Sequence, residues 1–312
     1  MAGILLLDTG DWVALIDRSE AAHKACVEVV ARPQALPVPT VEGGLGMDKW
    51  TERVKGYFDR LAEGYDTDLP WDELTERIYD ELTWRCIEPY LPPTGLVLDA
   101  GGGTGKWAIP IAERGLKVVL LDISAGMLEV ARRKIQERGL EGRISLVQGD
   151  IHEMDFPDRH FDFVLAEGVL EYCADIREAF RELVRVLKPR CFLVASVDSL
   201  YYVARAMADS GELDEIPELL QERRYLDEDG VYCNALAPED FRTLAEESGL
   251  EVLKLIGKPV LCQYLGEETK RCILGGPEKT GKLLEIELSL CGRPSLVGAG
   301  SHLQLVARKG DH

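Results

Sequence analysis

Short apolar runs alternate with segments of helical periodicity along most of the chain. Strands are predicted at residues 97–100, 117–121, 144–148, 161–166, 191–197 and 302–308. Helices are predicted between them, for example at 107–114 and at 124–136, where Ser124 is the N-cap and apolar residues recur at three- and four-residue spacing. Strands that alternate with helices in this way predict an α/β fold with a largely parallel sheet.

The turn after the first strand is rich in glycine: Asp99 is followed by Gly101, Gly103 and Gly105. Glycines at a strand-to-helix turn let the backbone approach a ligand closely, and the following helix offers free N–H groups. A dinucleotide fingerprint does not fit, because Lys106 stands where its third glycine is required. A phosphate-binding P-loop does not fit either, because neither its first glycine nor its final Ser or Thr is in place. The remaining pattern is D-x-G-x-G-x-G.

This motif resembles the first motif of the class I methyltransferases that depend on S-adenosylmethionine (SAM), and the resemblance runs from about residue 47 to 308. The second strand ends at Asp122, where a carboxylate can accept hydrogen bonds from a ribose diol. The third strand is followed by Asp150 and Ile151, which the resemblance places at the adenine. The fourth strand has the pattern F-D-x-V, and a proline-containing turn at 187–190 precedes the fifth. The residues that the resemblance assigns to the cofactor are Asp99, Gly101, Gly103, Gly105, Asp122, Ile123, Met127, Asp150, Ile151, Glu167, Tyr57 and Tyr65.

A helix is predicted before the first strand, where apolar residues from Trp50 to Ala62 recur at helical spacing. In the family, a helix of the form Y-F-x-x-x-A-x-x-Y-D lies over the cofactor, and Tyr57, Phe58 and Tyr65 match it here. Ordinary helix packing would give the same pattern. A further helix is predicted at 78–90.

The resemblance implies a Rossmann-like sheet of seven strands, the last antiparallel, with helices on both faces. The methyltransferase domain is expected to span 47–312, with insertions at about 199–237 and 258–301. Residues 199–240, which include the first insertion, have a net charge of −8, and the insertion has two apolar helical faces, which predicts a helical lid over the acceptor site. The second insertion carries a predicted helix at 279–290. SAM is the expected cofactor.

Composition limits the partners. The chain has 312 residues, 46% of them hydrophobic, and a net charge of −19. This charge disfavours nucleic acid as a partner, although Arg132, Arg133, Lys134 and Arg138 gather on one predicted helix, where a solvated face is the expected interpretation. Eight cysteines without C-x-x-C pairs favour a reducing cytoplasmic location, and no apolar run is long enough to span a membrane. The histidines do not fall at metal-ligand spacing, so no metal site is expected.

Residues 1–46 do not fit the methyltransferase pattern. Residues 4–7 are predicted to form an apolar strand that ends at Asp8, and an acid, Glu42, lies two residues after the V-P-T sequence at 38–40. This resembles the opening of a PIN-domain nuclease, whose later metal-binding acids have no counterpart before the methyltransferase begins. A remnant is therefore expected, packed on the methyltransferase or in the interface of a homodimer.

These observations predict methyl transfer to a small-molecule acceptor, with the acceptor atom undetermined. A hydroxyl or thiol acceptor requires a general base. The candidates are Glu167, Tyr172 and His152, together with Glu171 and tyrosines of the lid. A protein or RNA methyltransferase and a non-catalytic SAM-binding module stay open as alternatives.

Overall fold

The computed structural model describes residues 47–67, 72–227 and 229–311. The PIN-like segment at 1–42 and the expected boundary at residue 46 lie outside the described residues.

Seven strands form the expected sheet. Their bounds are β1 (Leu96–Ala100), β2 (Lys117–Asp122), β3 (Ile144–Gln148), β4 (Phe161–Ala166), β5 (Leu187–Ser199), β8 (Leu250–Lys258) and β9 (His302–Lys309). Strands β3, β2, β1, β4 and β5 are parallel neighbours in that order, and β9 lies antiparallel between β5 and β8. This is the class I methyltransferase topology, with the last strand antiparallel as predicted.

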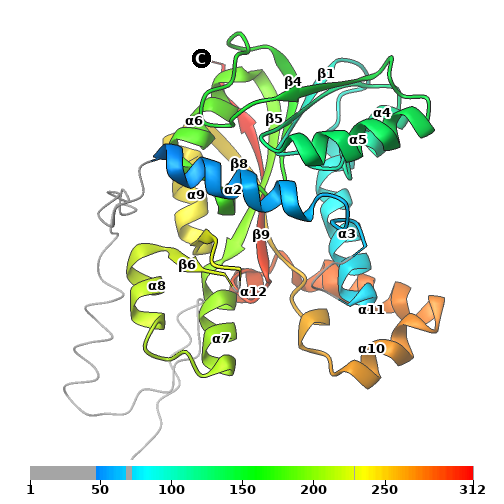
Figure 1. The fold of residues 1–312 in the computed structure, drawn as a ribbon. Helices are drawn as coiled ribbons and strands as arrows, with labels where there is room; N and C mark the ends of the chain where they lie inside the picture. The colour runs from blue at the N-terminus through cyan, green and yellow to red at the C-terminus, as the bar shows by residue number, and fades with distance from the viewer. Residues whose placement is uncertain (1–46, 68–71, 228, 312) are drawn as a thin grey trace, which may run out of the picture.

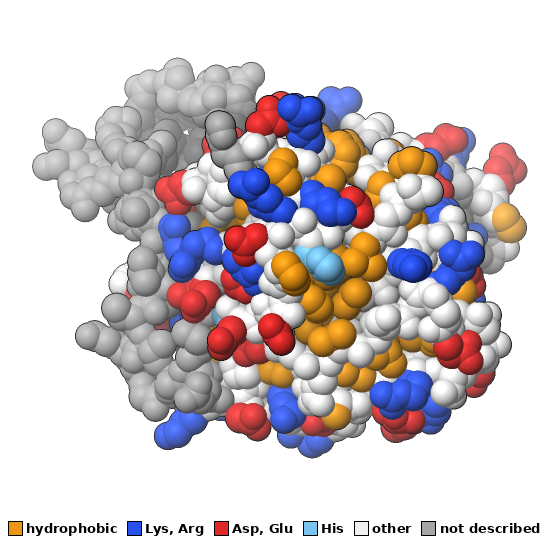
Figure 2. All heavy atoms as spheres, turned by 90° about the horizontal axis from the view of Figure 1, so that it is seen from above, with side chains coloured by type: hydrophobic (Ala, Val, Ile, Leu, Met, Phe, Trp, Pro, Cys, Tyr) orange, Lys and Arg blue, Asp and Glu red, His pale blue; other side chains and the backbone are white. Residues whose placement is uncertain are grey.

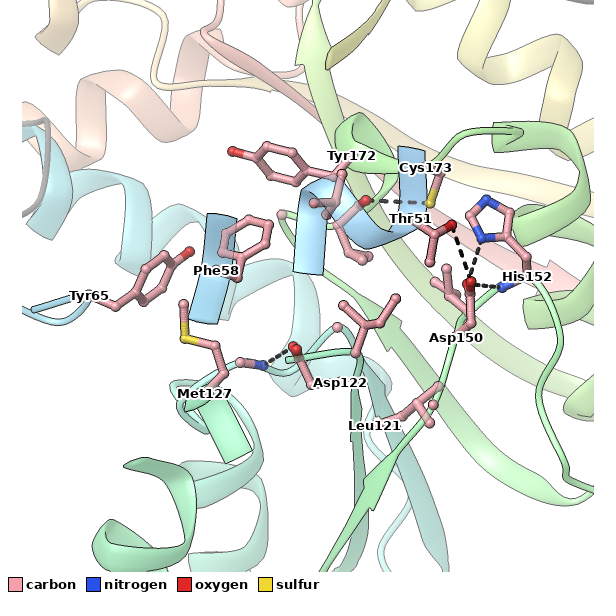
Figure 3. Close-up of a pocket in the computed structure, with 18 residues that line it drawn as sticks. Thr51, Phe58, Tyr65, Leu121, Asp122, Met127, Asp150, His152, Tyr172 and Cys173 are labelled. Carbon is pink, nitrogen blue, oxygen red and sulfur yellow. Dashed lines mark hydrogen bonds and ion pairs between the residues drawn. The ribbon is translucent and has the colours of Figure 1, made fainter. Parts of the chain in front are cut away.

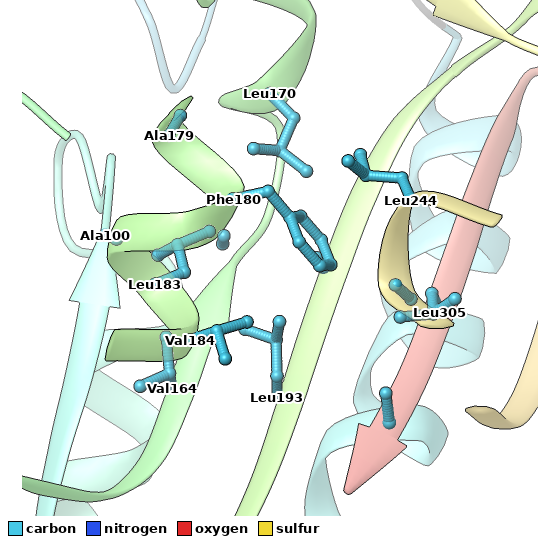
Figure 4. Packing of buried hydrophobic residues seen from close by; sticks show 14 of the residues in the cluster. Ala100, Val164, Leu170, Ala179, Phe180, Leu183, Val184, Leu193, Leu244 and Leu305 are labelled. Atoms are coloured by element: carbon cyan, nitrogen blue, oxygen red, sulfur yellow. The ribbon is translucent and has the colours of Figure 1, made fainter. Parts of the chain in front are cut away.

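Helices cover both faces of the sheet (Figure 1). One face packs against α3 (Glu73–Ile87), α4 (Ala108–Glu113), α5 (Ala125–Glu137) and α11 (Pro277–Leu290); α3 and the 3₁₀ turn η1 (Glu88–Tyr90) correspond to the helix expected at 78–90. The other face packs against α6 (Ile176–Val186) and α9 (Pro238–Glu247). Figure 4 shows Phe180 and Leu183 of α6 directed at the strands, with Leu244 of α9 beside them. Because side chains alternate along a strand, Val97 belongs to the first core and Leu98 to the second.

The fifth strand is longer than predicted. The expected turn at 187–190 lies within β5, which pairs with β4 at Leu187 and again from Phe192. Arg190 has a φ of 65° in this irregular stretch. The proline is therefore accommodated in a bulge, where no ladder hydrogen bond is needed from it.

The first insertion is only partly helical. It contains the expected helices α7 (Leu200–Ser210) and α8 (Ile216–Glu222), and also a hairpin of β6 (Arg224–Leu226) and β7 (Tyr232–Leu236) that was not predicted. Asp229 and Gly230 at the turn are a hairpin signal that the large number of acidic residues obscured. The end of β7 pairs in parallel with the last two residues of β5, which fixes the insertion to the main sheet.

The remaining elements lie near the carboxyl ends of the strands. The second insertion contains η3 (Cys262–Tyr264), α10 (Glu267–Leu274), the expected α11, and α12 (Pro294–Val297). Helix α2 (Met47–Leu61) crosses in front of the sheet, above the α7–α8 insertion in Figure 1. Within the described residues, no helix is both long and apolar enough to cross a membrane.

Candidate functional site

The glycine-rich turn after β1 borders the cavity described below. Gly101, Gly103 and Gly105 have φ angles of 71°, 52° and 86°, which only glycine adopts readily. The N–H of Gly101 donates to the carbonyl oxygen of Leu121 at 2.7 Å, which ties the turn to β2. A Cβ on Gly101 would lie 2.4 Å from Val169, whereas a Cβ on Gly103 would meet no atom within 4 Å. Gly101 is thus needed for packing, and Gly103 borders open space.

Asp122, at the end of β2, holds the turn and the next helix together. Its Oδ2 accepts from the N–H of Gly103 and its Oδ1 from the N–H of Ser124, both at 2.8 Å. Ser124 caps α5 as predicted, with its Oγ accepting from the N–H of Met127. Burial raises the pKa of Asp122, while the two backbone hydrogen bonds oppose that shift. The carboxylate still lines the cavity.

Asp150 follows β3 on the other side of the cavity. Its Oδ1 accepts from the backbone N–H of His152 at 2.9 Å and lies 2.6 Å from Nδ1 of the same residue. The Nε2 of His152 accepts from the N–H of Asp175, so the ring proton is on Nδ1 and is donated to Asp150. Burial alone would raise the pKa of Asp150, but the hydrogen bonds from His152 outweigh it and the pKa is lowered.

Helix α2 covers the cavity, as Figure 3 shows with Thr51 and Phe58 above Asp122 and Asp150. Asp59 of α2 accepts from the Oγ of Ser124 at 2.6 Å and from the N–H of Gly126 at 2.9 Å, which docks α2 on the start of α5. Phe58 packs edge-on against Tyr172, with ring centroids 4.9 Å apart. The cover is therefore anchored by hydrogen bonds as well as by apolar contact.

The cavity between these elements has a volume of about 670 Å³, counting the open space at its mouth. Eight of the twelve residues that the sequence assigned to the cofactor line it: Gly101, Gly103, Asp122, Ile123, Met127, Asp150, Ile151 and Tyr65. Tyr172 and His152, two of the three base candidates, also line it.

Four of the assigned residues do not line this cavity. Asp99 is 1% exposed beside the turn, and burial raises its pKa to about 7. Gly105 shapes the turn, and a Cβ added there would meet Ile109 and Leu120 rather than the cavity. Tyr57 points away, and its hydroxyl donates to Asp229 in the turn of the β6–β7 hairpin at 2.9 Å.

Glu167 is the fourth, and it belongs to a buried ion pair. Its Oε1 lies 2.5 Å from the Nζ of Lys258 and accepts from the hydroxyl of Tyr79 at 2.6 Å. The Nζ of Lys258 also donates to Thr83 at 2.5 Å, and Gln304 donates to the second oxygen of Glu167. Lys258 is fully buried, and this burial lowers its pKa despite the carboxylate beside it.

A second group of polar side chains lies beyond the cavity, at the carboxyl ends of β4 and β5. Glu171, Asp198 and His302 bring one ligand atom each within 4.8 Å of the others. The spacing of the histidines along the sequence did not indicate this group, because its three members come from distant parts of the chain. The sequence indicated Glu171 as a candidate general base, but it did not indicate Asp198 or His302 as site residues. They end β5 and begin β9, and these strands pair antiparallel with Asp198 opposite His302.

Comparisons with known proteins agree with this geometry. A family described as a methyltransferase domain matches residues 98–195. The ubiquinone/menaquinone biosynthesis C-methyltransferase UbiE of Shewanella sp. (strain ANA-3) is 37% identical over 147 residues, and the match spans 46% of this chain and 57% of that protein. The tRNA 5-carboxymethoxyuridine methyltransferase of Escherichia coli (strain K12) is 25% identical over 263 residues, 81% of this chain and 95% of that protein.

Solved structures share the fold. The [4+2]-cyclase SpnF superposes with a TM-score of 0.56 at 17% identity, over 84% of this chain and 97% of that chain. A SAM-dependent methyltransferase from Methanosarcina mazei superposes with a TM-score of 0.53 at 18% identity, over 72% and 97% of the two chains. Residues 98–195 therefore resemble the methyltransferase domain family, and the solved structures, at 17% and 18% identity, share the fold alone.

Proposed function

We propose that the protein transfers a methyl group from SAM to a small-molecule acceptor. The observation that carries this proposal is a covered cavity that is lined by an open glycine position, Gly103, and by carboxylates that follow β2 and β3. Carboxyl ends of parallel strands at a topological switch point are where α/β sheets bind ligands. The wider domain, residues 47–312 with two insertions, is proposed to act as one unit.

We assign the cavity residues as follows. Asp122 accepts the two ribose hydroxyls, because each of its oxygens uses one lone pair on a backbone N–H and keeps another. Asp150 and Ile151 receive the adenine, and Gly101 and Gly103 receive the methionine end. Asp99 and Gly105 shape the turn from outside the cavity. Tyr57 and Glu167 are not part of this assignment, since their side chains are bonded elsewhere.

The chemistry needs little from the protein beyond alignment. SAM carries a methyl group on a sulfonium, which is reactive without a covalent enzyme intermediate. The protein's part is to hold an acceptor in line with that methyl group and to exclude water. Helix α2 contacts the β6–β7 hairpin through aromatic and cation–π interactions, which would help to exclude water. Trp50 stacks on Tyr232 with ring centroids 5.2 Å apart, and the Arg224 guanidinium lies 4.9 Å from the centroid of the Trp50 ring.

None of the three base candidates is free to act. His152 uses both ring nitrogens in hydrogen bonds, and Glu167 is neutralised by Lys258. Burial raises the pKa of Tyr172 well above its usual value, so it keeps its proton.

A small acceptor is favoured over nucleic acid by the pairing of the basic side chains. Each of the four cations on α5 contacts a carboxylate: Arg132 with Glu129, Arg133 with Glu63, Lys134 with Asp66, and Arg138 with Glu113. On the face in Figure 2, the Lys and Arg side chains of the described residues are interspersed with Asp and Glu. Phosphate binding favours a continuous basic surface instead.

RNA is the second candidate acceptor, because the match to the tRNA methyltransferase extends over 95% of that protein. A turnover screen distinguishes the two. The full chain is incubated with SAM and with separate pools of hydroxylated aromatics, carboxylic acids, amines, thiols and bulk tRNA, and S-adenosylhomocysteine release is measured. Gly103→Ala serves as the cavity-blocked control.

Release with a small-molecule pool, and a product heavier by one CH₂, would support the proposal. Release with tRNA alone would favour the second candidate. SAM binding without release from any pool would favour a binding module, and failure to bind SAM would refute the assignment of the cavity. The fold alone does not distinguish methyl transfer from other reactions, since SpnF is a cyclase with the same architecture.

A further inference from the structure

The group formed by Glu171, Asp198 and His302 has a geometry suited to a metal ion. The Nε2 of His302 lies 3.1 Å from Oδ1 of Asp198. One ligand atom from each of the three residues, including a carboxylate oxygen of Glu171, lies within 4.8 Å of the other two. Two ligands of one ion, each about 2.1 Å from it and about 90–110° apart, are separated by roughly 3.0–3.4 Å. The three atoms can therefore share an ion after separations of up to 4.8 Å close by at most about 1.4–1.8 Å.

The hydrogen bonds of His302 favour the tautomer with its proton on Nδ1, in which the lone pair of Nε2 faces Asp198. The hydroxyl of Ser301 donates to the carbonyl oxygen of Lys258 at 2.9 Å, so its oxygen accepts from Nδ1 of His302 at 3.1 Å. A neutral ring protonated on Nδ1 offers Nε2 as a ligand, and a hydrogen bond on the other nitrogen is the usual way in which a metal-binding histidine is oriented.

Glu171 supplies the independent evidence for a ligand. It is 4% exposed, and its Oε2 has no hydrogen-bond partner among the described residues. The segment is held in place by Asn234 of β7, whose amide donates to the carbonyl oxygen of Glu171 at 3.1 Å. A buried carboxylate oxygen left unpaired is costly, and coordination to a cation would remove that cost.

The charge of the region also favours a cation. The buried Lys258 acts on this region electrostatically, but its ammonium group is paired with Glu167. Among the described residues, Glu171 and Asp198 contact no Lys or Arg side chain. The hydroxyl of Tyr225 donates to Oδ2 of Asp198 at 2.6 Å, which leaves Oδ1 directed at His302. Two carboxyls and one imidazole thus meet in a pocket that still admits solvent, since the side chains of Asp198 and His302 are 14% and 13% exposed.

We propose that Glu171, Asp198 and His302 bind one divalent first-row transition-metal ion at the carboxyl ends of β4 and β5. One nitrogen and two carboxylate ligands suit Zn²⁺, Mn²⁺ or Co²⁺ better than an all-oxygen ion such as Ca²⁺. Three protein ligands leave open positions on the ion. The site adjoins the cofactor cavity, because Tyr172, the residue after Glu171, lines it.

The test is metal binding by the full chain without SAM, so its result is independent of the proposed methyl transfer. Protein stripped with EDTA is titrated with Co²⁺ and Mn²⁺, and the visible absorption of Co²⁺ and the loss of free Mn²⁺ signal in electron paramagnetic resonance are followed. One ion per chain is expected. Glu171→Gln and His302→Gln should each weaken binding at least tenfold, while thermal unfolding without metal checks that both variants are folded.

His152→Gln is the matched control, because His152 also contacts an aspartate, Asp150, but in a pair without a third ligand. Binding by this variant should equal that of the wild type. A folded wild type that binds no ion would overturn the proposal, and so would binding that persists in both Glu171→Gln and His302→Gln. A loss of binding in His152→Gln alone would place the ion in the cofactor cavity and also overturn it.

Discussion

Replacing Gly103 with alanine isolates the role of the glycine turn, because the chain contains a matched control. Gly103 and Gly139 have similar φ angles, 52° and 64°, and a Cβ on either would meet no atom within 4 Å. Gly103 borders the cavity, whereas Gly139 follows α5 at the surface. Both substitutions carry the same backbone strain, and only one of them places a methyl group in the cavity.

The backbone cost should be nearly equal in the two variants. A residue with a Cβ in the left-handed region loses about 1–2 kcal/mol relative to glycine. For a domain of this size, each kcal/mol lowers the melting temperature by about 2–4 °C. Both Gly103→Ala and Gly139→Ala should therefore melt a few degrees below the wild type. Differential scanning calorimetry without ligand measures this part.

Cofactor affinity should separate the variants. A methyl group forced into a site shaped for a ligand costs about 1–3 kcal/mol by overpacking, and 1.4 kcal/mol is a tenfold change in Kd. Isothermal titration with SAM should therefore give a Kd about 5- to 140-fold higher for Gly103→Ala and an unchanged Kd for Gly139→Ala. SAM should raise the melting temperature of the control but raise that of Gly103→Ala less. Equal affinities in the two variants would refute the placement of the cofactor against this turn.

Two further predictions concern buried charge. Burial raises the pKa of Asp99 to about 7, so the folded protein keeps a proton that the unfolded chain releases near pH 4. The free energy of unfolding should therefore fall by about 1.4 kcal/mol per pH unit as the pH rises from 4 to 7. In Asp99→Asn, the free energy of unfolding measured with urea should lose this difference between pH 5 and pH 7, and SAM should bind as it does to the wild type. An unchanged pH dependence would contradict the raised pKa of Asp99, and a lost affinity for SAM would contradict its placement outside the cavity. Lys258→Met should destabilise the protein by about 3–5 kcal/mol, because it leaves Glu167 buried without its partner. The double variant Lys258→Met/Glu167→Gln should regain at least half of that loss, and additive losses would show that the two groups are not coupled.

The order of strands and helices could be predicted from the sequence because its signals are local. Apolar runs, the Ser124 cap and the glycines of the turn act over a few residues, and each was found where expected. Asp122 and Asp150 were placed correctly for the same reason, since a residue that directly follows a parallel strand lies at the carboxyl edge of the sheet. The hairpin β6–β7 was missed although its turn carried a local signal.

Side-chain direction and long-range pairing were decided only by the tertiary structure. Asp99 and Glu167 follow the family pattern in sequence, yet Asp99 is buried outside the cavity and Glu167 turns to Lys258, which is 91 residues away. The group of Glu171, Asp198 and His302 depends on the antiparallel register that sets Asp198 opposite His302. No spacing in the sequence encodes that register, because it results from how β9 packs between β5 and β8. Local propensity determines the elements of this protein, and packing determines which of their side chains meet.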